Sequence, residues 1–254
     1  MAEERLQKIL SKSGYGARRK CESIILEKRV TVNNQLICEL GAKADPDIDD
    51  IKVDGKNVSF EKIYYVMFNK PAGCLTTAAP DIHRGRSTVM DFFKDFPARI
   101  FPVGRLDYDT EGLLLLTNDG EFANRILHPK HKVFKTYEAL IQSLPSNSQI
   151  EQLNNGILLD DGITAPAKIK TISGNKFIEY SKGKFRGALM EISIREGRKR
   201  QVRRMFRAIG YEVLYLKRVK IGKLKLGSLP VGTYKILTDK EAESATVELT
   251  DSSY

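Results

Sequence analysis

The chain has 254 residues and a formal net charge of +10; 41% of its residues are hydrophobic and 29% charged, which predicts a globular protein of one large or two modest domains. No apolar run approaches the ~20 residues of a membrane span, and Met-Ala-Glu-Glu-Arg does not open a signal peptide, so we expect a cytoplasmic protein that does not contact membranes. Three widely separated cysteines without Cys-x-x-Cys spacing predict free thiols and favour neither disulfides nor a zinc site.

The positive charge is concentrated in two segments. Residues 5–29 carry eight Lys and Arg against two Glu, and residues 196–225 carry eleven against two. A basic chain with pI near 9.4 favours a polyanionic partner. Two basic segments far apart in the sequence suit a protein whose two domains both bind a phosphate backbone.

Residues 1–60 form the first predicted domain. Three apolar residues starting at Leu6 repeat at helical spacing, and a second helix follows a glycine-containing break. Short alternating strands come next. The pair Asp54-Gly55 between two of them indicates a tight hairpin, because both residues tolerate a positive φ.

Residues 61–240 form the second predicted domain. Apolar runs predict strands over 63–68, 99–103, 113–117, 135–141, 157–172, 176–180, 188–194 and 211–219. Helical spacing predicts helices over 121–127, 146–156 and 202–209. A capping box from Thr238 to Glu241 starts a short final helix, and we expect an acidic, polar C-terminal tail over 241–254.

The loop 104–112 is the strongest candidate for chemistry. It places Asp107, Asp109 and Glu111 directly before the apolar run Leu113–Leu116. Strong acids beside a buried strand are costly unless they are paired or used. Three interpretations are open. The carboxylates cap turns or pair with surface arginines; they bind a metal ion; or one aspartate is a nucleophile held by a basic partner.

The metal interpretation rests on Asp107-x-Asp109-x-Glu111-Gly112, which imitates the start of an EF-hand calcium loop. It fails at the twelfth position, where Asn118 stands in place of a bidentate glutamate. The turn and nucleophile interpretations stay open on the residues alone.

The run Gly-Arg-Leu-Asp-x-Asp-Thr-x-Gly-Leu-Leu-Leu-Leu-Thr-Asn-Asp-Gly, residues 104–120, resembles the signature of bacterial ribosomal RNA pseudouridine synthases. The most similar group is the B-type enzymes of the large subunit. Residues 5–33 are similar to their N-terminal alpha-L RNA-binding domain, a fold shared with the fourth small-subunit ribosomal protein. The resemblance implies an α+β chain: a small alpha-L domain, then a catalytic domain built on a mostly antiparallel mixed β-sheet with flanking helices.

The same resemblance implies catalytic roles. The aspartate of the Arg-Leu-Asp step is catalytic in that family, which implies Asp107 here. The Lys-Thr-Tyr step ending at Tyr137 resembles a motif whose tyrosine packs against the target base. The Gln-Val-Arg step ending at Arg203 resembles one whose arginine pairs with the catalytic aspartate. Uridine isomerisation needs no metal or organic cofactor, and we expect none. Whether Asp107 attacks C1′ or removes a ribose proton stays open.

The resemblance also implies RNA contacts from both basic segments. We expect Lys70, in a Lys-Pro-x-Gly step, to be structural or RNA-facing, and Asp109 and Glu111 to cap turns or pair with cations. The expected partner is ribosomal RNA or a ribosomal subunit precursor, bound by a monomer. The expected RNA-binding residues are Arg5, Lys8, Lys12, Arg18, Arg19, Lys20, Arg105, Arg198, Lys199, Arg200 and Arg204.

Overall similarity favours 23S (large-subunit) ribosomal RNA as the target, with 16S (small-subunit) RNA as the alternative. Two other classes of protein stay open. One is a non-catalytic RNA-binding ribosome-assembly factor, which the basic segments alone would support. The other is a metal-dependent nuclease that uses Asp107 and Asp109 and would lose its activity on chelation.

Overall fold

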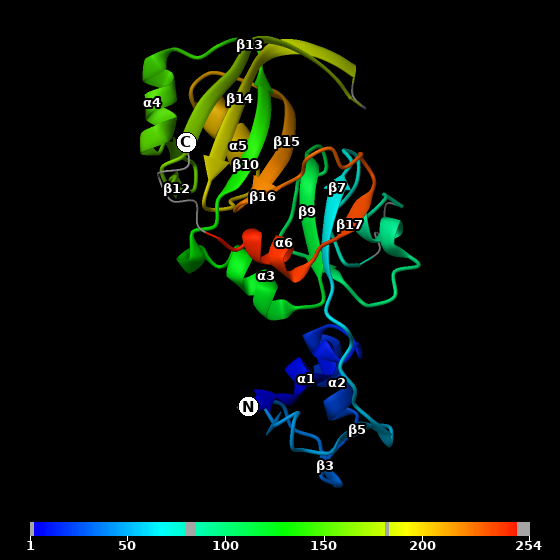
Figure 1. Ribbon diagram of the computed structural model, residues 1–254. Coiled ribbons are helices and arrows are strands. Elements are labelled where there is room, and N and C mark those ends of the chain that lie inside the picture. The colour runs from blue at the N-terminus through cyan, green and yellow to red at the C-terminus, as the bar shows by residue number, and fades with distance from the viewer. Residues whose placement is uncertain (1–2, 80–84, 181–182, 248–254) are drawn as a thin grey trace. The chain divides into compact units, whose positions relative to one another are not determined.

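The computed structural model describes residues 3–79, 85–180 and 183–247 (Figure 1). The chain divides into two compact units, residues 1–64 with 95–100, and residues 65–94 with 101–254. The division falls shortly after the predicted domain boundary at residue 60. In the described part of the chain, no helix has both the length and the apolar character to cross a membrane.

The first unit packs two short helices, α1 and α2, against small sheets. Apolar residues of both helices are buried, including Leu6 and Ile25. The Asp54-Gly55 turn is confirmed, with φ of 51° and 77° at the two residues. The elements are β1 (Glu4–Arg5), α1 (Leu6–Lys12), α2 (Arg18–Leu26), β2 (Val30–Val32), β3 (Gln35–Ile37), β4 (Lys43–Ala44), β5 (Ile51–Val53) and β6 (Lys56–Asn57).

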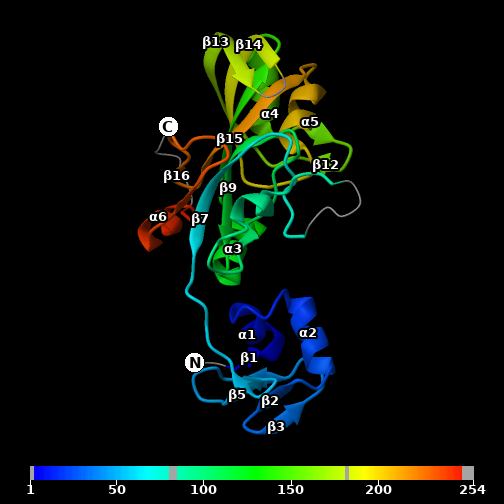
Figure 2. The ribbon, with the colours of Figure 1, turned by 90° about the vertical axis from the view of Figure 1, so that its right-hand side faces the viewer.

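A nine-stranded mixed sheet forms the centre of the second unit (Figures 1 and 2). Its strands lie in the order β13-β14-β10-β15-β9-β7-β17, with β16 added to β15 and β8 added to β9. Every pairing is antiparallel except β9 with β15. The expected mostly antiparallel mixed sheet is confirmed. The strands are β7 (Tyr65–Lys70), β8 (Phe101–Pro102), β9 (Glu111–Thr117), β10 (Lys135–Ile141), β13 (Lys168–Tyr180), β14 (Gly183–Ile194), β15 (Val213–Ile221), β16 (Leu224–Lys225) and β17 (Tyr234–Ile236).

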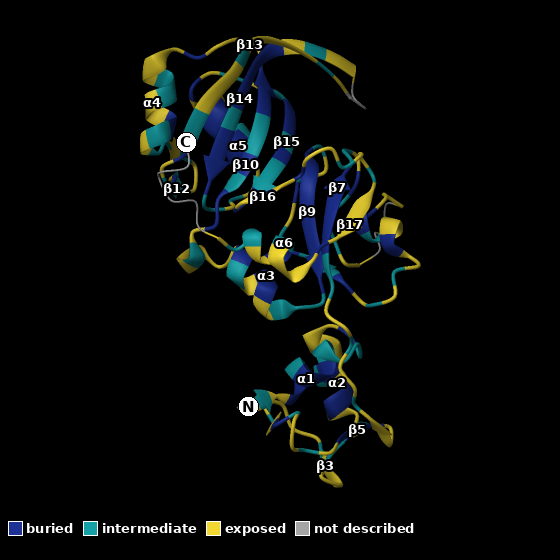
Figure 3. Ribbon diagram, in the orientation of Figure 1, coloured by how far each residue is buried: buried dark blue, intermediate teal, exposed yellow. Residues whose placement is uncertain are grey.

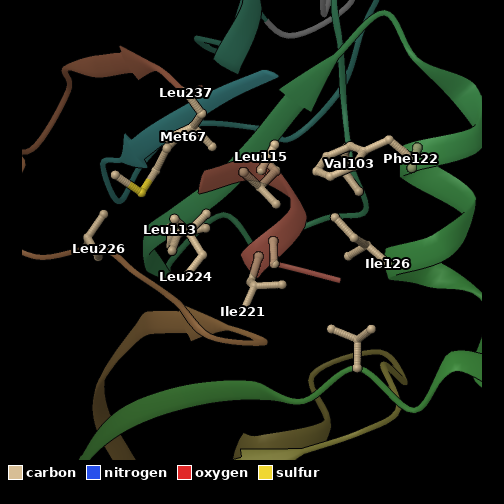
Figure 4. Packing of buried hydrophobic residues seen from close by; sticks show 14 residues of the cluster. Met67, Val103, Leu113, Leu115, Phe122, Ile126, Ile221, Leu224, Leu226 and Leu237 are labelled. Atoms are coloured by element: carbon tan, nitrogen blue, oxygen red, sulfur yellow. The ribbon is translucent and has the colours of Figure 1, made fainter. Parts of the chain in front are cut away.

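The helices of this unit divide between two hydrophobic cores. Leu153 of α4 and Phe206 of α5 are buried against β10, β14 and β15. Phe122 of α3 and Ala242 of α6 are buried against β7, β9 and β16. Figure 4 shows this second core, with Leu113 and Leu115 of β9 near its centre. The helices are η1 (Val89–Phe93), α3 (Gly120–Leu127), η2 (Pro129–His131), α4 (Asn147–Asn155), α5 (Gln201–Ala208) and α6 (Asp239–Ser244).

The strand β9 is the predicted buried run. All seven of its residues are buried, so it is dark along its whole length in Figure 3. Its polar residues, Glu111 and Thr117, lie at its two ends. The strand therefore anchors the loop 104–110 at its N-terminal end in the middle of the sheet.

Two predicted ranges differ from the structure. The predicted strand over 157–172 is not continuous: a turn at Asp160 and Asp161 folds its first part into the hairpin of β11 (Leu158–Leu159) and β12 (Gly162–Ile163), and only residues 168–172 of it belong to β13. Residues 241–244, which the sequence analysis assigns to the tail, form most of α6; Ala242 in this helix and Ala245 directly after it are buried. Residues 248–254 of that tail lie outside the described residues.

Candidate active site

A fully buried lysine holds the loop 104–110 from inside the fold. Lys70 ends β7, and its Nζ donates hydrogen bonds to the backbone oxygens of Pro71 (2.9 Å), Asp107 (3.2 Å) and Thr110 (3.0 Å). Burial lowers the pKa of Lys70 to about 8, partly opposed by nearby acidic groups, Glu111 among them. Because its side chain is inaccessible, the RNA-facing alternative is wrong and Lys70 is structural.

Further hydrogen bonds fix the residues on either side of Asp107. The Thr76 hydroxyl donates to the carbonyl of Leu106 at 2.9 Å and accepts from its N–H at 3.3 Å. The N–H of Gly73 donates to the carbonyl of Tyr108 at 2.8 Å. Lys70 bonds the carbonyl of Asp107 itself, so the backbone is held at three successive residues, 106 to 108. The half-buried side chain of Asp107 makes no hydrogen bond to the described residues.

The second residue of β9, directly after the acidic loop (residues 107–111, with Asp107, Asp109 and Glu111), must be a glycine. Gly112 has a φ of 104° and pairs with Arg218 across the parallel β9–β15 contact. A Cβ at this position would lie 2.2 Å from the backbone oxygen of Arg218. Any other residue would therefore push β9 and β15 apart. The glycine at position 112 thus permits β9 and β15 to pair, and this pairing brings the loop beside Arg218.

Asp107 and Tyr137 line one cavity of about 400 Å³. Asp107 comes from the acidic loop and Tyr137 from β10, so the structure brings together two residues that lie in separate predicted motifs. The other polar residues that line the cavity are Arg105, Thr110, Lys135, Arg195, Glu196, Arg198, Lys199, Arg200, Gln201 and Arg218.

The expected ion pair between Arg203 and Asp107 is wrong. The guanidinium of Arg203 instead contacts Asp109, donating to its backbone oxygen at 3.2 Å and lying 3.3 Å from its carboxylate. It also donates to the carbonyl of Val213 at 2.8 Å, and Arg203 is not one of the described residues that line the cavity. Arg200 pairs with Asp109 as well, at 3.1 Å. Asp109 thus has the cation partners expected of it, and it fastens the acidic loop to the start of α5.

Two further arginines of the second basic segment are also used within the fold. Arg198 donates to the carboxylate of Asp161 and to the backbone oxygens of Asp161, Gly162 and Ile163. Arg204 pairs with Asp160 and Asp161. Hydrogen bonds from Arg204 are the largest cause that lowers the pKa of Asp161. The turn between β11 and β12 therefore supplies carboxylates that pair with part of this basic segment.

The remaining candidate RNA-binding residues differ in exposure. Lys8 and Lys12 both pair with Glu4, at 3.1 and 2.9 Å. Arg200 is exposed although it contacts Asp109. The candidates that are exposed, with no carboxylate partner among the described residues, are Arg5, Arg18, Arg19, Lys20, Arg105 and Lys199.

Arg218 is a cavity residue to which the sequence analysis gives no role. It lies on β15 with 5% of its surface exposed. Its Nε donates to the carbonyl of Leu113 at 2.7 Å, its Nη1 to the hydroxyl of Tyr137 at 3.5 Å, and its guanidinium carbon lies 6.0 Å from the centre of the Tyr137 ring. In the predicted strand 211–219, Arg218 continues the alternate positions of Leu214 and Leu216, and a charge on that apolar strand face was the signal that could have revealed it.

Comparison with known proteins identifies the chain. The family model for RNA pseudouridylate synthase matches residues 64–208, more than half of the chain, and an S4 domain matches residues 4–43. The chain belongs to the RNA pseudouridylate synthase family. It is an isomerase with an S4 RNA-binding domain, which confirms the expected family, fold and class of enzyme.

Similar proteins cover nearly the whole chain of this isomerase. It is 46% identical over 240 residues to ribosomal large subunit pseudouridine synthase B of Bacillus subtilis (strain 168), covering 94% of each chain. It is 44% identical to an uncharacterized RNA pseudouridine synthase of Aquifex aeolicus (strain VF5), covering 95% of this chain and 93% of that one. A crystal structure of a pseudouridylate synthase matches with a TM-score of 0.66 and 31% identity, covering 95% of this chain and 99% of the other.

Proposed function

We propose that this isomerase converts a uridine of 23S ribosomal RNA to pseudouridine, with Asp107 as its reacting carboxylate. The observation that carries the proposal is the shared cavity of Asp107 and Tyr137, whose volume of about 400 Å³ suits a small-molecule group such as one nucleobase. The name of the Bacillus subtilis relative supports the large subunit as the source of the substrate. A base within folded RNA must leave its stack to enter such a cavity.

In the proposed reaction the bond between uracil N1 and ribose C1′ breaks, and its electron pair leaves with the uracil. The Asp107 carboxylate either bonds to C1′ or takes the C2′ proton. The uracil then turns and its C5 bonds to C1′; the bond between Asp107 and C1′ breaks in the first route, and the proton returns to C2′ in the second. Finally C5 loses its proton and N1 gains one. Tyr137 packs against the uracil and takes part in the proton transfer from C5. The hydrogen bonds from Lys70, Thr76 and Gly73 hold Asp107 in place during these steps.

The proposed role of Arg203 follows from its contacts. Its bonds to Asp109 stabilise the acidic loop two residues beyond Asp107, so it acts on the reacting carboxylate through the loop backbone. Asp109 is thereby occupied by two guanidinium groups, and this disfavours the nuclease alternative, in which Asp109 would bind a metal ion.

We propose that RNA binding uses the exposed cations of residues 1–60 together with Arg105 and Lys199 beside the cavity. Residues 61–240 make up most of the catalytic domain in this proposal, and α6 extends it to Ser244. Surface cations that have no internal carboxylate partner are free to contact phosphates. In this proposal the enzyme acts in the cytoplasm as a monomer, on ribosomal RNA or a subunit precursor, without a cofactor.

Tritium release from uridine labelled at C5 tests the proposal. Unmodified 23S and 16S transcripts, and assembly intermediates of each subunit, are incubated with wild type, Asp107→Asn or the control Asp239→Asn, an exposed aspartate on α6, all with EDTA. We expect release from the 23S substrate by wild type and control, and none by Asp107→Asn. Equal release by Asp107→Asn would remove Asp107 from the mechanism, and release from 16S alone would favour the small ribosomal subunit as the target. RNA binding without release from any substrate would favour the assembly-factor alternative.

A further inference from the structure

Five cations line the cavity without a carboxylate partner among the described residues: Arg105, Lys135, Arg195, Lys199 and Arg218. Only Arg218 of these five is buried, and Lys135 lies on the neighbouring strand β10. The hydrogen bonds of Arg218 go to a carbonyl and to the Tyr137 hydroxyl, and its Nη2 is buried with no hydrogen-bond partner in the part of the chain that the structure describes. Lys135 is half-buried, and its Nζ donates to the carbonyl of Ile126 at 3.1 Å. Burial, and then the charge of Arg218, lowers the pKa of Lys135 to about 8.

Arg218 differs from the other arginines near the cavity because it is buried and has no carboxylate partner among the described residues. Arg105, which is exposed, and Arg195, which is half-buried, likewise have no described carboxylate partner but keep contact with solvent. Arg198, Arg200, Arg203 and Arg204 are all paired with carboxylates, whereas Arg218 is the least exposed of the five and has none. Burying a guanidinium without a counter-ion is costly. A neutral side chain could fill the same place in β15, so the structure keeps a positive charge beside the cavity at a cost in stability.

The proposed reaction creates a negative charge in that cavity. When the N1–C1′ bond breaks with its electron pair on the uracil, the detached base is an anion whose charge spreads over N1, O2 and O4. This holds whether Asp107 bonds to C1′ or removes the C2′ proton. Fixed positive charge beside such a group lowers the barrier, because it is already in place when the charge develops.

We infer that Arg218 stabilises the anionic uracil during its detachment and reattachment, with Lys135 as a second cation on the same cavity. A backbone phosphate is a poorer match for Arg218, because the side chain is 95% buried and a phosphate stays with the RNA chain, whereas an unstacked base enters the cavity. The position of Arg218 against the hydroxyl and ring of Tyr137 places its charge next to the residue that packs against the base. This inference rests on the proposed function.

Single-turnover kinetics with enzyme in excess test the inference. Wild type, Arg218→Gln, Arg218→Lys and the control Arg207→Gln, an exposed arginine on α5, are compared on the reactive ribosomal RNA. We expect Arg218→Gln to lower the rate of uridine disappearance by about 10²-fold, with unchanged RNA Kd, while Arg218→Lys recovers part of the rate. Arg207→Gln should react like wild type. Circular dichroism and the Tm of each variant report whether it folds.

The decisive readout uses RNA whose target is 5-fluorouridine. Fluorine withdraws electrons and stabilises the uracil anion, so this base depends less on a cation. We expect the rate loss of Arg218→Gln, and of Arg218→Lys if the Gln variant does not fold, to be smaller on 5-fluorouridine than on uridine. Equal losses on both substrates, or a wild-type rate for Arg218→Gln, would refute the inference and leave the proposed function intact. If wild type itself converts neither uridine nor 5-fluorouridine, the proposed function fails and the inference with it.

Discussion

The buried charge of Lys70 predicts a specific pH dependence of stability. Lys70→Met removes the donor of three backbone hydrogen bonds, and we expect it to lower the free energy of unfolding at pH 7.5 by about 2–5 kcal/mol. The pKa of Lys70 is about 8 in the folded protein against 10.5 for an ordinary lysine. Between these values the unfolded chain binds more protons at this residue than the folded chain, so the contribution of Lys70 to stability rises with pH and is lost as the pH falls through 8.

The size of the effect follows from the two pKa values. Over the interval from pH 7.5 to 9.5, wild type should gain about 2 kcal/mol of unfolding free energy relative to Lys70→Met. Urea unfolding of both proteins at pH 7.5, 8.5 and 9.5 measures this difference, in which the titration of groups common to both proteins cancels. The exposed Lys240→Met serves as the control and should follow wild type at every pH. A constant difference between wild type and Lys70→Met would refute the assignment of a buried, charged lysine.

Three further substitutions test the acidic loop. Gly112→Ala combines a φ of 104° with a 2.2 Å clash, so the free energy of unfolding in urea should fall by more than about 3 kcal/mol. The control Gly227→Ala, whose Cβ would meet open space, should lose about 1 kcal/mol. Asp109→Asn removes the carboxylate that fastens the loop to α5. We expect the free energy of unfolding in urea to fall by about 1–3 kcal/mol and tritium release to be at least about tenfold slower. An unchanged release rate would contradict this expectation. Tyr215→Phe removes the hydroxyl that donates to Glu111 at 2.9 Å; unfolding free energy should fall by about 1–3 kcal/mol, and no change would mean that water replaces the hydroxyl.

Local patterns in the sequence predict local structure here because each depends on near neighbours. The Asp54-Gly55 turn, the buried strand β9 and the capping box at Thr238 are all confirmed. The meeting of Asp107 and Tyr137 in one cavity also agrees with the roles that their motifs imply. Those roles stay predictions until the tritium assay is done.

The partners of the charged groups could not be predicted in the same way. Arg203 lies far along the chain from both aspartates of the loop, and only the path of the tight turn decides that Asp109 rather than Asp107 meets it. The use of Arg204 within the fold depends on a turn at Asp160 that the sequence analysis took for strand. Charge pairing needs tertiary positions, and a count of charges along the sequence does not contain them.

The position of the cavity follows from the one parallel contact described in the large sheet. The strands β9 and β15 meet there, β9 belonging mainly to the core with α3 and α6, and β15 mainly to the core with α4 and α5. Val103 and Ile126 of the core with α3 and α6 line the cavity, as do Val202 and Leu216 of the core with α4 and α5. Parallel strands are not joined by a hairpin, so the loop before β9 does not lead into β15. It ends where Lys217 and Arg218 of β15 pair with Glu111 and Gly112 of β9. The carboxylate of the loop and the buried guanidinium of Arg218 therefore reach one cavity from two separately packed halves of the sheet. Each is held by the other half, because Arg218 donates to the carbonyl of Leu113 on β9 and Asp109 pairs with arginines at the start of α5.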